Sequence, residues 1–260
     1  MSACPAIETH SLSIGYPVRG GARRVVHRGL DLQLSAGAVT CLLGRNGAGK
    51  STLLRTLCGL LPPLGGEILL EGRPLRTYSP EALSAQVGVV LTDRGFPGGI
   101  TVYELVSMGR YPHTDFFGTL READHAVVRE ALAMVGIAAR AGRLLAELSD
   151  GERQKAYIAK ALAQECPVIL LDEPTAFLDV PSRAETWETL RRLAHEQQKA
   201  VLLSTHDVES AVRMADSLWL LPEAGLESAS DAVQCGSPAE MLADGTLESF
   251  FGVRLPQCGF

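Results

Sequence analysis

A glycine-rich segment between an apolar run and a helical pattern is the feature that most restricts how this chain can fold. Val39–Leu43 is a short apolar run, as expected for a strand that is covered on both faces in a parallel α/β sheet. The segment Gly44–Thr52 follows it directly, and Leu53, Leu54 and Leu57 then recur on one face of a helix. A strand, a glycine-rich loop and a helix in this order predict an α/β unit.

The glycine-rich segment has the spacing of a phosphate-binding loop, Gly44-x4-Gly49-Lys50-Ser51. Its glycines let backbone N–H groups turn inward around an anion, and the helix start adds unsatisfied donors and a positive dipole end. We expect Lys50 to reach the β- and γ-phosphates of a nucleotide and the Ser51 hydroxyl to ligate Mg²⁺. A turn without a ligand is the alternative, which the flanking strand and helix disfavour. The predicted nucleotide-binding residues are Gly44, Arg45, Asn46, Gly47, Ala48, Gly49, Lys50, Ser51 and Thr52.

Two carboxylates stand at the end of another apolar run, Val168–Leu171. Parallel sheets place functional groups at the carboxyl ends of their strands. We therefore expect Asp172 to hold Mg²⁺ through a water molecule and Glu173 to polarise the water that attacks the γ-phosphate. An acid pair that only caps the next helix is the alternative, disfavoured by the phosphate-binding pattern upstream. The run Ala200–Ser204 should bring His206 to the same edge as a γ-phosphate contact.

The two halves of this α/β pattern are separated by a helical region. Residues 12–16 and 30–34 alternate in polarity, which predicts half-buried antiparallel strands. From about 95 to 165 strand signals are scarce, and helices are predicted after the capping residues Thr101 and Ser149 and over about 121–135. Beyond this region the prediction is strand 168–171, helix from about Ser182, strand 200–204, helix from about Asp207, strand 217–221 and a helix capped at Ser237.

The composition restricts the class of protein. The chain has 260 residues, 46% of them hydrophobic and 21% charged, so it can build a large core and is not expected to be disordered. Its net charge of −6 argues against nucleic-acid binding, which needs a surplus of Lys and Arg. No apolar run is long enough for a membrane span, and residues 1–10 lack a secretory signal pattern. The six cysteines form no CxxC pair, which indicates a reduced, cytosolic setting.

The segment Leu148–Glu152 is the most discriminating of the remaining patterns. Ser149 and Glu152 have the spacing of a capping box at a helix start. A capped helix start that carries a glycine, here Gly151, also predicts a second anion-binding site. One phosphate-binding loop is enough to bind one nucleotide, so the ligand of this second anion-binding site is still to be explained.

At these motifs the sequence resembles the ATPase subunit of ABC transporters, and the likeness covers nearly the whole chain. Gly44–Thr52 resembles the Walker A motif, and Leu170–Pro174 is similar to Walker B with its catalytic glutamate. Leu148–Glu152 resembles the LSGGQ signature, with Asp150 in place of a glycine and Glu152 in place of the glutamine. Together with the D-loop and the switch histidine described next, these are five motifs in the family's order, which makes the resemblance very specific.

Further residues match the family and carry its expectations. Phe177–Asp179 resembles the D-loop, His206 the switch histidine, and Tyr16 the aromatic residue that stacks on adenine. The resemblance implies an α/β P-loop NTPase fold with a RecA-like core, an N-terminal antiparallel β subdomain and an inserted α-helical subdomain. It also implies one domain over 1–260, with the core in 1–94 and 165–260 and the helical signature subdomain in 95–164.

The resemblance further implies a nucleotide-sandwich dimer of two copies of the chain. Ser149 and Gly151 of one subunit, within the nucleotide-binding set Ser149, Asp150, Gly151 and Glu152, would face the ATP held by Lys50 of the other. The second anion site would then bind the ATP that the other subunit holds. ATP binding would close the dimer, and hydrolysis would reopen it.

One residue departs from the family pattern. Thr92 stands where the family carries a glutamine that contacts Mg²⁺ and transmits the nucleotide state to the membrane partner. A threonine is shorter than that glutamine. The hypothesis is that Thr92 or Asp93 acts through a water molecule, which would keep hydrolysis but alter its coupling to transport.

Local similarity also predicts a class of transporter. The stretches Thr101–Pro112 and Ala156–Gln164 are similar to ATPase subunits of importers for iron chelates, a class that carries siderophores, haem or cobalamin. The implied partners are integral-membrane permease subunits and, indirectly, a substrate-binding protein, which would place the chain at the cytoplasmic face of the cell membrane. Tyr111, Phe116 and Phe117 either help to form the groove for a permease helix or fill the core of the helical subdomain.

Other classes of protein are alternatives to this interpretation. One is another kind of ABC transporter subunit, such as that of a metal-ion importer, and another is a soluble ABC ATPase that takes no part in transport. A P-loop kinase or GTPase is a third, against which the signature and the switch histidine count heavily. The sequence does not name the cargo, the permease or the direction of transport.

Overall fold

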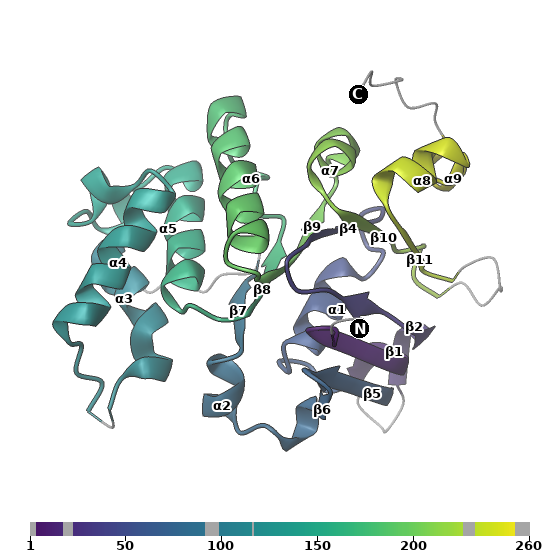
Figure 1. Cartoon of the computed structure of the whole chain (residues 1–260), viewed down its shortest axis with the longest axis horizontal. Coiled ribbons are helices and arrows are strands. Elements are labelled where there is room, and N and C mark those ends of the chain that lie inside the picture. The colour runs from purple at the N-terminus through teal and green to yellow at the C-terminus, as the bar shows by residue number, and fades with distance from the viewer. Residues whose placement is uncertain (1–3, 18–22, 92–98, 116, 226–231, 253–260) are drawn as a thin grey trace.

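The computed structural model describes residues 4–17, 23–91, 99–115, 117–225 and 232–252. Figure 1 shows a central sheet with α6 (Val180–His195) and α7 (Val208–Met214) on one face and α1 (Lys50–Leu57) on the other, together with a separate group of antiparallel strands. A cluster of helices, α3 to α5, lies beyond the β7 end of the sheet. The predicted α/β fold with an antiparallel β part and a helical insertion is confirmed.

Two kinds of regular element make up the described chain. The strands are β1 (Ile7–Pro17), β2 (Arg23–Leu30), β3 (Gln33–Leu34), β4 (Val39–Leu43), β5 (Gly65–Leu70), β6 (Arg73–Pro74), β7 (Val87–Val90), β8 (Val168–Asp172), β9 (Ala200–Thr205), β10 (Ser217–Leu220) and β11 (Gln234–Gly236). The other α-helices are α2 (Pro80–Ser84), α3 (Val102–Ser107), α4 (Glu122–Met134), α5 (Asp150–Ala163), α8 (Pro238–Ala243) and α9 (Thr246–Phe251), and the 3₁₀ helices are η1 (Leu75–Thr77), η2 (Met108–His113), η3 (Ala138–Arg140) and η4 (Leu145–Glu147).

The central sheet has the strand order β11-β10-β4-β9-β8-β7. All of its pairs are parallel except that of β10 with β11. The strands β4, β9 and β8 are neighbours, so the segments that follow Leu43, Asp172 and Thr205 leave the sheet side by side at one edge. This is the edge at which the sequence predicts the nucleotide site.

The inner strands β4, β8 and β9 are buried on both faces because a core lies on each side of the sheet. Along β4, Cys41 faces the core under α6 and α7, whereas Leu42 faces the core around α1. The two tryptophans of the chain divide in the same way, since Trp187 belongs to the first core and Trp219 to the second, at 2% and 1% exposure. This explains the short continuous apolar runs of the sequence.

The smaller sheet corrects one prediction about the strands. Residues 30–34 do not form one strand, because β2 ends at Leu30 and β3 begins at Gln33. Between them side-chain bonds interrupt the ladder: Asp31 accepts from the Ser11 N–H, and the Thr9 hydroxyl accepts from the Leu32 N–H at 2.9 Å. The Thr9 N–H still donates to the Leu32 carbonyl at 2.9 Å. The leucines at 30, 32 and 34 are nevertheless all buried, as the alternation predicted.

The helices between residues 101 and 163 begin where their capping residues predict. Thr101 and Ser149 each form a reciprocal capping box with the glutamate three residues later, and α4 covers nearly the predicted range. The domain boundaries stay a prediction. Within the described ranges, no helix combines the length and the apolar character that crossing a membrane requires.

A buried arginine joins the helical elements to one another. Arg110 of η2 donates to Asp124 of α4 at 3.0 Å, to the carbonyl of Ala163 at 2.7 Å and to Glu165 at 2.6 Å. Arg110 and Asp124 are both buried. Next to it, a Cβ on Gly109 would lie 2.4 Å from the Lys160 carbonyl of α5, so the close packing of η2 on α5 requires glycine.

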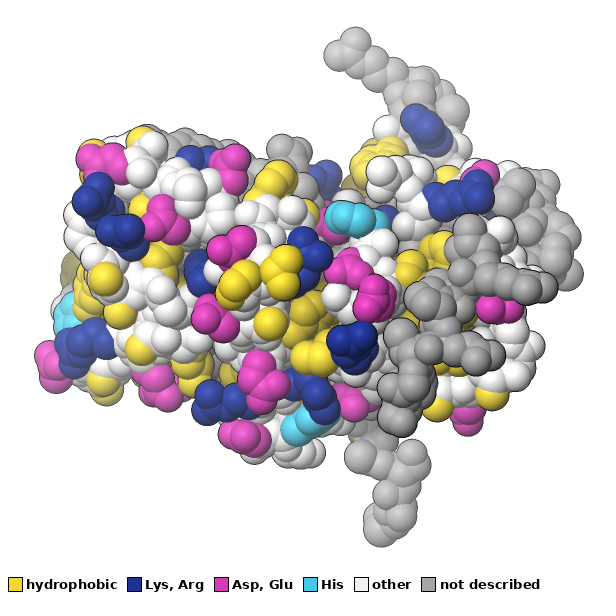
Figure 2. All heavy atoms as spheres, turned by 90° about the horizontal axis from the view of Figure 1, so that it is seen from above, with side chains coloured by type: hydrophobic (Ala, Val, Ile, Leu, Met, Phe, Trp, Pro, Cys, Tyr) yellow, Lys and Arg dark blue, Asp and Glu magenta, His cyan; other side chains and the backbone are white. Residues whose placement is uncertain are grey.

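The surface seen from above carries both signs of charge. In Figure 2, Lys and Arg side chains stand among Asp and Glu side chains, with hydrophobic side chains in small groups between them. Nucleic-acid binding proteins instead present a continuous basic patch or stripe. The described part of the face in Figure 2 shows no such continuous patch.

Candidate functional site

The glycine-rich loop after β4 has a backbone that larger residues could not adopt. Gly47 and Gly49 have φ angles of +82° and +98°, in the left-handed region that favours glycine. A Cβ on Gly49 would lie 2.5 Å from the Cγ1 atom of Val26, and a Cβ on Gly44 would lie 2.6 Å from the carbonyl oxygen of Leu221. The loop therefore packs closely against its surroundings, and α1 starts at Lys50 without a side-chain cap.

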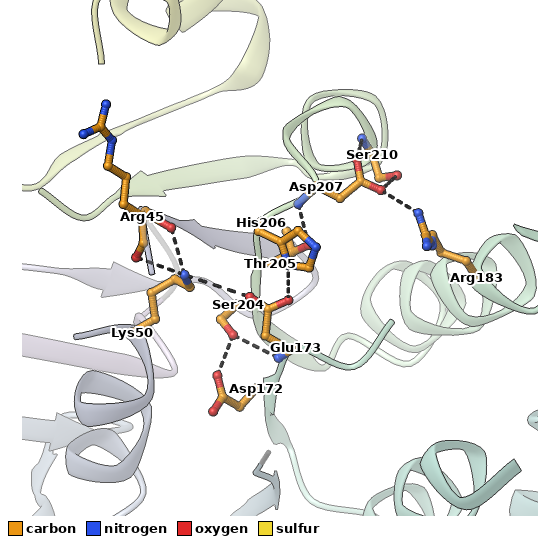
Figure 3. Close-up of polar contacts among 11 residues, drawn as sticks. Arg45, Lys50, Asp172, Glu173, Arg183, Ser204, Thr205, His206, Asp207 and Ser210 are labelled. Atoms are coloured by element: carbon orange, nitrogen blue, oxygen red, sulfur yellow. Dashed lines mark hydrogen bonds and ion pairs between the residues drawn. The ribbon is translucent and has the colours of Figure 1, made fainter. Parts of the chain in front are cut away.

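The loop and the two predicted carboxylates line a single pocket of about 380 Å³. Its lining consists of Arg45, Asn46, Gly47, Ala48, Gly49, Lys50, Ser51, Thr52, Asp172 and Glu173. Lys50 is buried, and its Nζ donates to the Gly44 carbonyl at 2.8 Å and lies 3.9 Å from Oε1 of Glu173 (Figure 3). The helix start, the ammonium group and the acids thus converge, although the loop and the acids are more than 100 residues apart in the sequence.

A serine links the two carboxylates. Ser204 of β9 donates its hydroxyl proton to Oδ1 of Asp172 at 2.7 Å and accepts the backbone N–H of Glu173 at 3.0 Å (Figure 3). Glu173 has a φ of +49°, so the chain turns sharply where β8 ends. Asp172 is buried, whereas the Glu173 side chain is 17% exposed and faces the pocket.

His206 lies next to Glu173, as predicted from its place after β9. Its Nδ1 is 2.8 Å from Oε2 of Glu173, and its side chain is 65% exposed. The following residue, Asp207, caps α7 through the Ser210 N–H and forms an ion pair with Arg183 of α6 at 3.2 Å. Burial raises the pKa of Asp207, but the bonds from Ser210 and the charge of Arg183 outweigh burial and leave that pKa below its ordinary value.

Two residues from the smaller sheet reach the loop and its helix. Tyr16 of β1 is 38% exposed, and its hydroxyl lies 2.9 Å from the Thr52 hydroxyl of α1. His27 of β2 is buried, and its Nε2 lies 2.7 Å from the carbonyl oxygen of Ala48 in the loop. The smaller sheet therefore contacts the loop through His27 and places the exposed ring of Tyr16 beside α1.

The predicted second anion site lines a separate hollow of about 760 Å³. Its lining consists of Gly136, Ile137, Ala139, Arg140, Ser149, Asp150, Gly151, Glu152, Lys155, Phe177, Leu178, Asp179 and Ser182. A Cβ on Gly151 would lie 3.0 Å from the Phe177 carbonyl, so the start of α5 packs closely on the segment after β8. This hollow and the loop pocket have no lining residue in common.

The two acidic residues of this segment are both paired with arginines. Asp150 accepts from Arg153 at 2.9 Å, and Glu152 accepts from Arg140 at 2.8 Å. The bond from Arg140, and after it the Ser149 N–H, holds the pKa of Glu152 below its ordinary value. Each negative charge that this sequence has in place of a glycine or a glutamine thus has an arginine partner nearby.

Comparison with protein families supplies the identification. The model of one family, described as ABC transporter, matches residues 27–176, which include the phosphate-binding loop, the signature segment and both carboxylates. The chain belongs to the ABC transporter family. As a member of this family it is the ATP-binding subunit, and it hydrolyses ATP.

Individual ABC proteins match over most of their length. An uncharacterised ABC transporter ATP-binding protein of Methanocaldococcus jannaschii, MJ0873, is 41% identical over 83% of this chain and 72% of its own. The ferric enterobactin transport ATP-binding protein FepC of Escherichia coli is 35% identical over 94% of this chain and 86% of its own. The structure of cbiO1 from Clostridium perfringens, part of the ABC transporter complex cbiONQ, has a TM-score of 0.74 at 28% identity and covers 97% and 96% of the two chains.

Most of the residues expected from the ABC motifs are among those that the structure brings together. Lys50, Ser51, Asp172 and Glu173 share one pocket, and His206 contacts Glu173. Residues of the signature and the D-loop line the other hollow. Asp179 also caps α6 by accepting a bond from the Ser182 N–H, so this helix begins at Val180, two residues before the predicted start. Predictions for Thr92, Asp93 and Phe116 concern positions outside the described residues.

Sequence reasoning missed three supporting residues of this ABC site. Ser204, His27 and Arg183 each bond to a motif residue or to its neighbour. A lone serine at a strand end, a lone histidine in a strand and one arginine in a helix carry no pattern of their own. Their contacts depend on how strands distant in the sequence pair, so no local signal could have found them.

Proposed function

We propose that this chain is the ATP-hydrolysing subunit of an importer for iron chelates, of the siderophore, haem or cobalamin class, and that the residues of its loop pocket act as follows. The observation that supports the catalytic part is that one pocket is lined at once by the phosphate-binding loop and by Asp172 and Glu173. The loop N–H groups and Lys50 bind the phosphates, and Tyr16 stacks on the adenine ring beside α1.

Hydrolysis in this proposal uses Glu173 as the general base. Water attacks the γ-phosphorus, its proton passes to the Glu173 carboxylate, and the bond from the γ-phosphorus to the ADP oxygen breaks. His206 holds Oε2 of Glu173 through Nδ1, and its side chain, which is exposed, would contact the γ-phosphate. Lys50 stays near both the phosphates and Glu173, so it stabilises the charge that develops during transfer.

The same pocket suits Mg²⁺. The Ser51 hydroxyl and the buried Asp172 carboxylate both line it, and oxygen ligands of this kind are those that Mg²⁺ prefers, together with phosphate and water. In this proposal Ser51 would ligate the ion and Asp172 would hold it through a water. Bound there, Mg²⁺ would neutralise charge on the β- and γ-phosphates.

The separate signature hollow supports a dimer of two copies. Within one chain, Ser149 and Gly151 do not line the pocket of Lys50. A second copy would supply them to the ATP held by the first, together with Asp150 and Glu152, whose charges Arg153 and Arg140 offset. ATP then joins the two copies, and its hydrolysis separates them.

The proposed membrane partner is an integral-membrane permease, so the chain works at the cytoplasmic face of the membrane and serves a substrate-binding protein indirectly. Tyr111 and Phe117 are 58% and 87% exposed, which contradicts a role in filling the helical core and favours a role in an interface. Tyr111 lies on η2, which packs against α2 and α5. Those two helices also line a largely apolar hollow of about 620 Å³, in which a permease helix would fit.

The cargo part of the proposal depends on relatives. The name of FepC states transport of ferric enterobactin, an iron chelate, and this protein is similar over 94% of the chain. The stretches Thr101–Pro112 and Ala156–Gln164 support the same class by local similarity.

Replacing Lys50 with alanine should weaken ATP binding by about 10- to 100-fold, because hydrogen bonds to charged groups typically contribute on the order of 1.5–3 kcal/mol. Equilibrium titration with a fluorescent ATP analogue measures the effect. Arg45→Ala is a matched control that removes a more exposed cation of the same loop, and it should change the affinity less. If Lys50→Ala bound ATP as tightly as the unmodified protein, the role assigned to Lys50 in phosphate binding would be contradicted.

Transport tests the remainder of the proposal. With the cognate permease, the chain should co-purify in detergent and support ATP-dependent uptake of at least one member of a panel of iron chelates and cobalamin. Tyr111→Ser with Phe117→Ser should reduce co-purification at least several-fold and leave ATP affinity unchanged, since both side chains lie outside the loop pocket. Uptake confined to free metal ions would contradict the cargo class, and co-purification of the double variant at the normal level would contradict the interface.

A further inference from the structure

Ser204 occupies an unusual position for a serine. It lies in β9 with no exposed surface, in a strand whose other inward residues are almost all apolar. Alanine would fill nearly the same space there without bringing a polar group into the core. A buried hydroxyl is costly unless it is hydrogen-bonded, so its partners identify what it does.

Both partners of the hydroxyl belong to the adjacent end of β8. The parallel register pairs Ser204 with Asp172, which brings the serine Oγ to 2.7 Å from Oδ1 of that carboxylate. A hydroxyl has one proton, and Ser204 donates it to Asp172. Its lone pairs are then available for a donor, and the Glu173 N–H supplies one at 3.0 Å.

The bond to the Glu173 N–H coincides with a strained point of the backbone. Glu173 has a φ of +49°, a left-handed conformation that is unfavourable for a residue with a side chain. The turn directs the Glu173 carboxylate away from the sheet, toward Lys50 at 3.9 Å and His206 at 2.8 Å. Such a conformation persists only where its surroundings hold it.

We propose that Ser204 is a positioning residue for ATP hydrolysis: its hydroxyl fixes the Asp172 carboxylate and the turned backbone of Glu173 at the same time. It touches neither nucleotide nor water in this role and acts through the two acids. The inference rests on the proposed roles of Asp172 and Glu173. Figure 3 shows the two dashed lines that join Ser204 to Asp172 and to Glu173.

Removing the Ser204 hydroxyl should slow ATP hydrolysis while leaving ATP binding almost unchanged. In Ser204→Ala the Glu173 N–H loses its acceptor and Asp172 loses a donor, whereas the loop N–H groups and Lys50 are unchanged. We expect kcat to fall by about 10-fold or more, as for other lost hydrogen bonds to charged groups, with KM for ATP changed less than about 2-fold. Ser204→Thr retains the hydroxyl and should recover most of kcat.

The experiment measures steady-state ATP hydrolysis, affinity for a fluorescent ATP analogue and the melting temperature of the purified full-length chain and its variants. Ser107→Ala is the matched control, because Ser107 is also a buried serine but its hydroxyl has no hydrogen-bond partner within the described structure. It should hydrolyse and bind ATP like the unmodified protein. Glu173→Gln is included to test the proposed function in the same assay.

The outcomes separate the two proposals. If Glu173→Gln hydrolyses ATP at the normal rate, the role of Glu173 fails, whatever Ser204→Ala does. If Glu173→Gln is inactive and Ser204→Ala keeps kcat within about 2-fold, only the inference about Ser204 is overturned. It is also overturned if Ser204→Ala loses ATP affinity in proportion to its loss of kcat. The same holds if Ser204→Thr has the melting temperature of the unmodified protein but hydrolyses ATP as slowly as Ser204→Ala.

Discussion

Replacing Glu173 with glutamine should reduce ATP hydrolysis by about 10²- to 10⁴-fold while ATP still binds, because removal of a general base typically costs this much. Glutamine keeps the size and most polar contacts of the side chain but does not take up a proton. Its amide can still reach His206, and the loop around Lys50 is untouched. In the proposed dimer, ATP would persist between the two copies and hold them closed.

Two measurements test this expectation. Hydrolysis is followed by phosphate release, and closure is followed by gel filtration with ATP, where the variant should elute as a dimer. Glu122→Gln provides the same acid-to-amide exchange on the exposed surface of α4, where the acid pairs with Arg129, and should behave like the unmodified protein. Monomer alone in the presence of ATP would argue against the nucleotide-sandwich arrangement, and normal phosphate release would argue against Glu173 as the base.

The largest loss of stability is expected from Arg110→Leu. Arg110 and Asp124 are both buried, and removing one partner of a buried ion pair typically destabilises by about 3–5 kcal/mol because the other charge stays uncompensated. Asp124 would keep its bond from the Arg121 N–H but lose its guanidinium partner, and the Ala163 carbonyl would lose a donor as well. The free energy of unfolding from urea denaturation measures the effect.

A surface arginine of the same subdomain serves as the control. Arg129→Leu breaks the exposed pair with Glu122, and solvent screening leaves exposed pairs with little effect on stability. Arg110→Lys should recover only part of the loss, since an ammonium cannot match the fork of a guanidinium that serves three acceptors. Equal stability of Arg110→Leu and Arg129→Leu would show that the buried cluster does not hold the helices together.

The sequence predicts best those parts of the fold whose structure is determined by a few residues that are close together in the chain. The loop at Gly44–Thr52 and the capping boxes at Thr101, Ser149 and Ser237 form where their spacing predicts. The division at Asp31–Leu32 could not be predicted, because Thr9 and Ser11 compete there from another strand. The apolar alternation reports only which side chains are buried.

The candidate site divides in the same way. Each motif is visible in the sequence, but the link between them through Ser204 depends on which residue of β9 stands opposite Asp172. The stretch Thr101–Pro112 shows a second limit: its Gly109 and Arg110 serve the packing of η2 on α4 and α5. Part of its similarity to other ATPase subunits therefore reflects architecture and carries no information about cargo.

The division of the two tryptophans between the faces of the central sheet gives the protein built-in optical reporters. Trp187 and Trp219 are the only tryptophans of the chain, and each is buried in a different core. Trp187→Phe would leave emission only from the core that packs on α1, and Trp219→Phe only from the core under α6. The fluorescence of each variant then reports on one face, so loosening around the nucleotide loop can be distinguished from loosening beneath α6 without any added label.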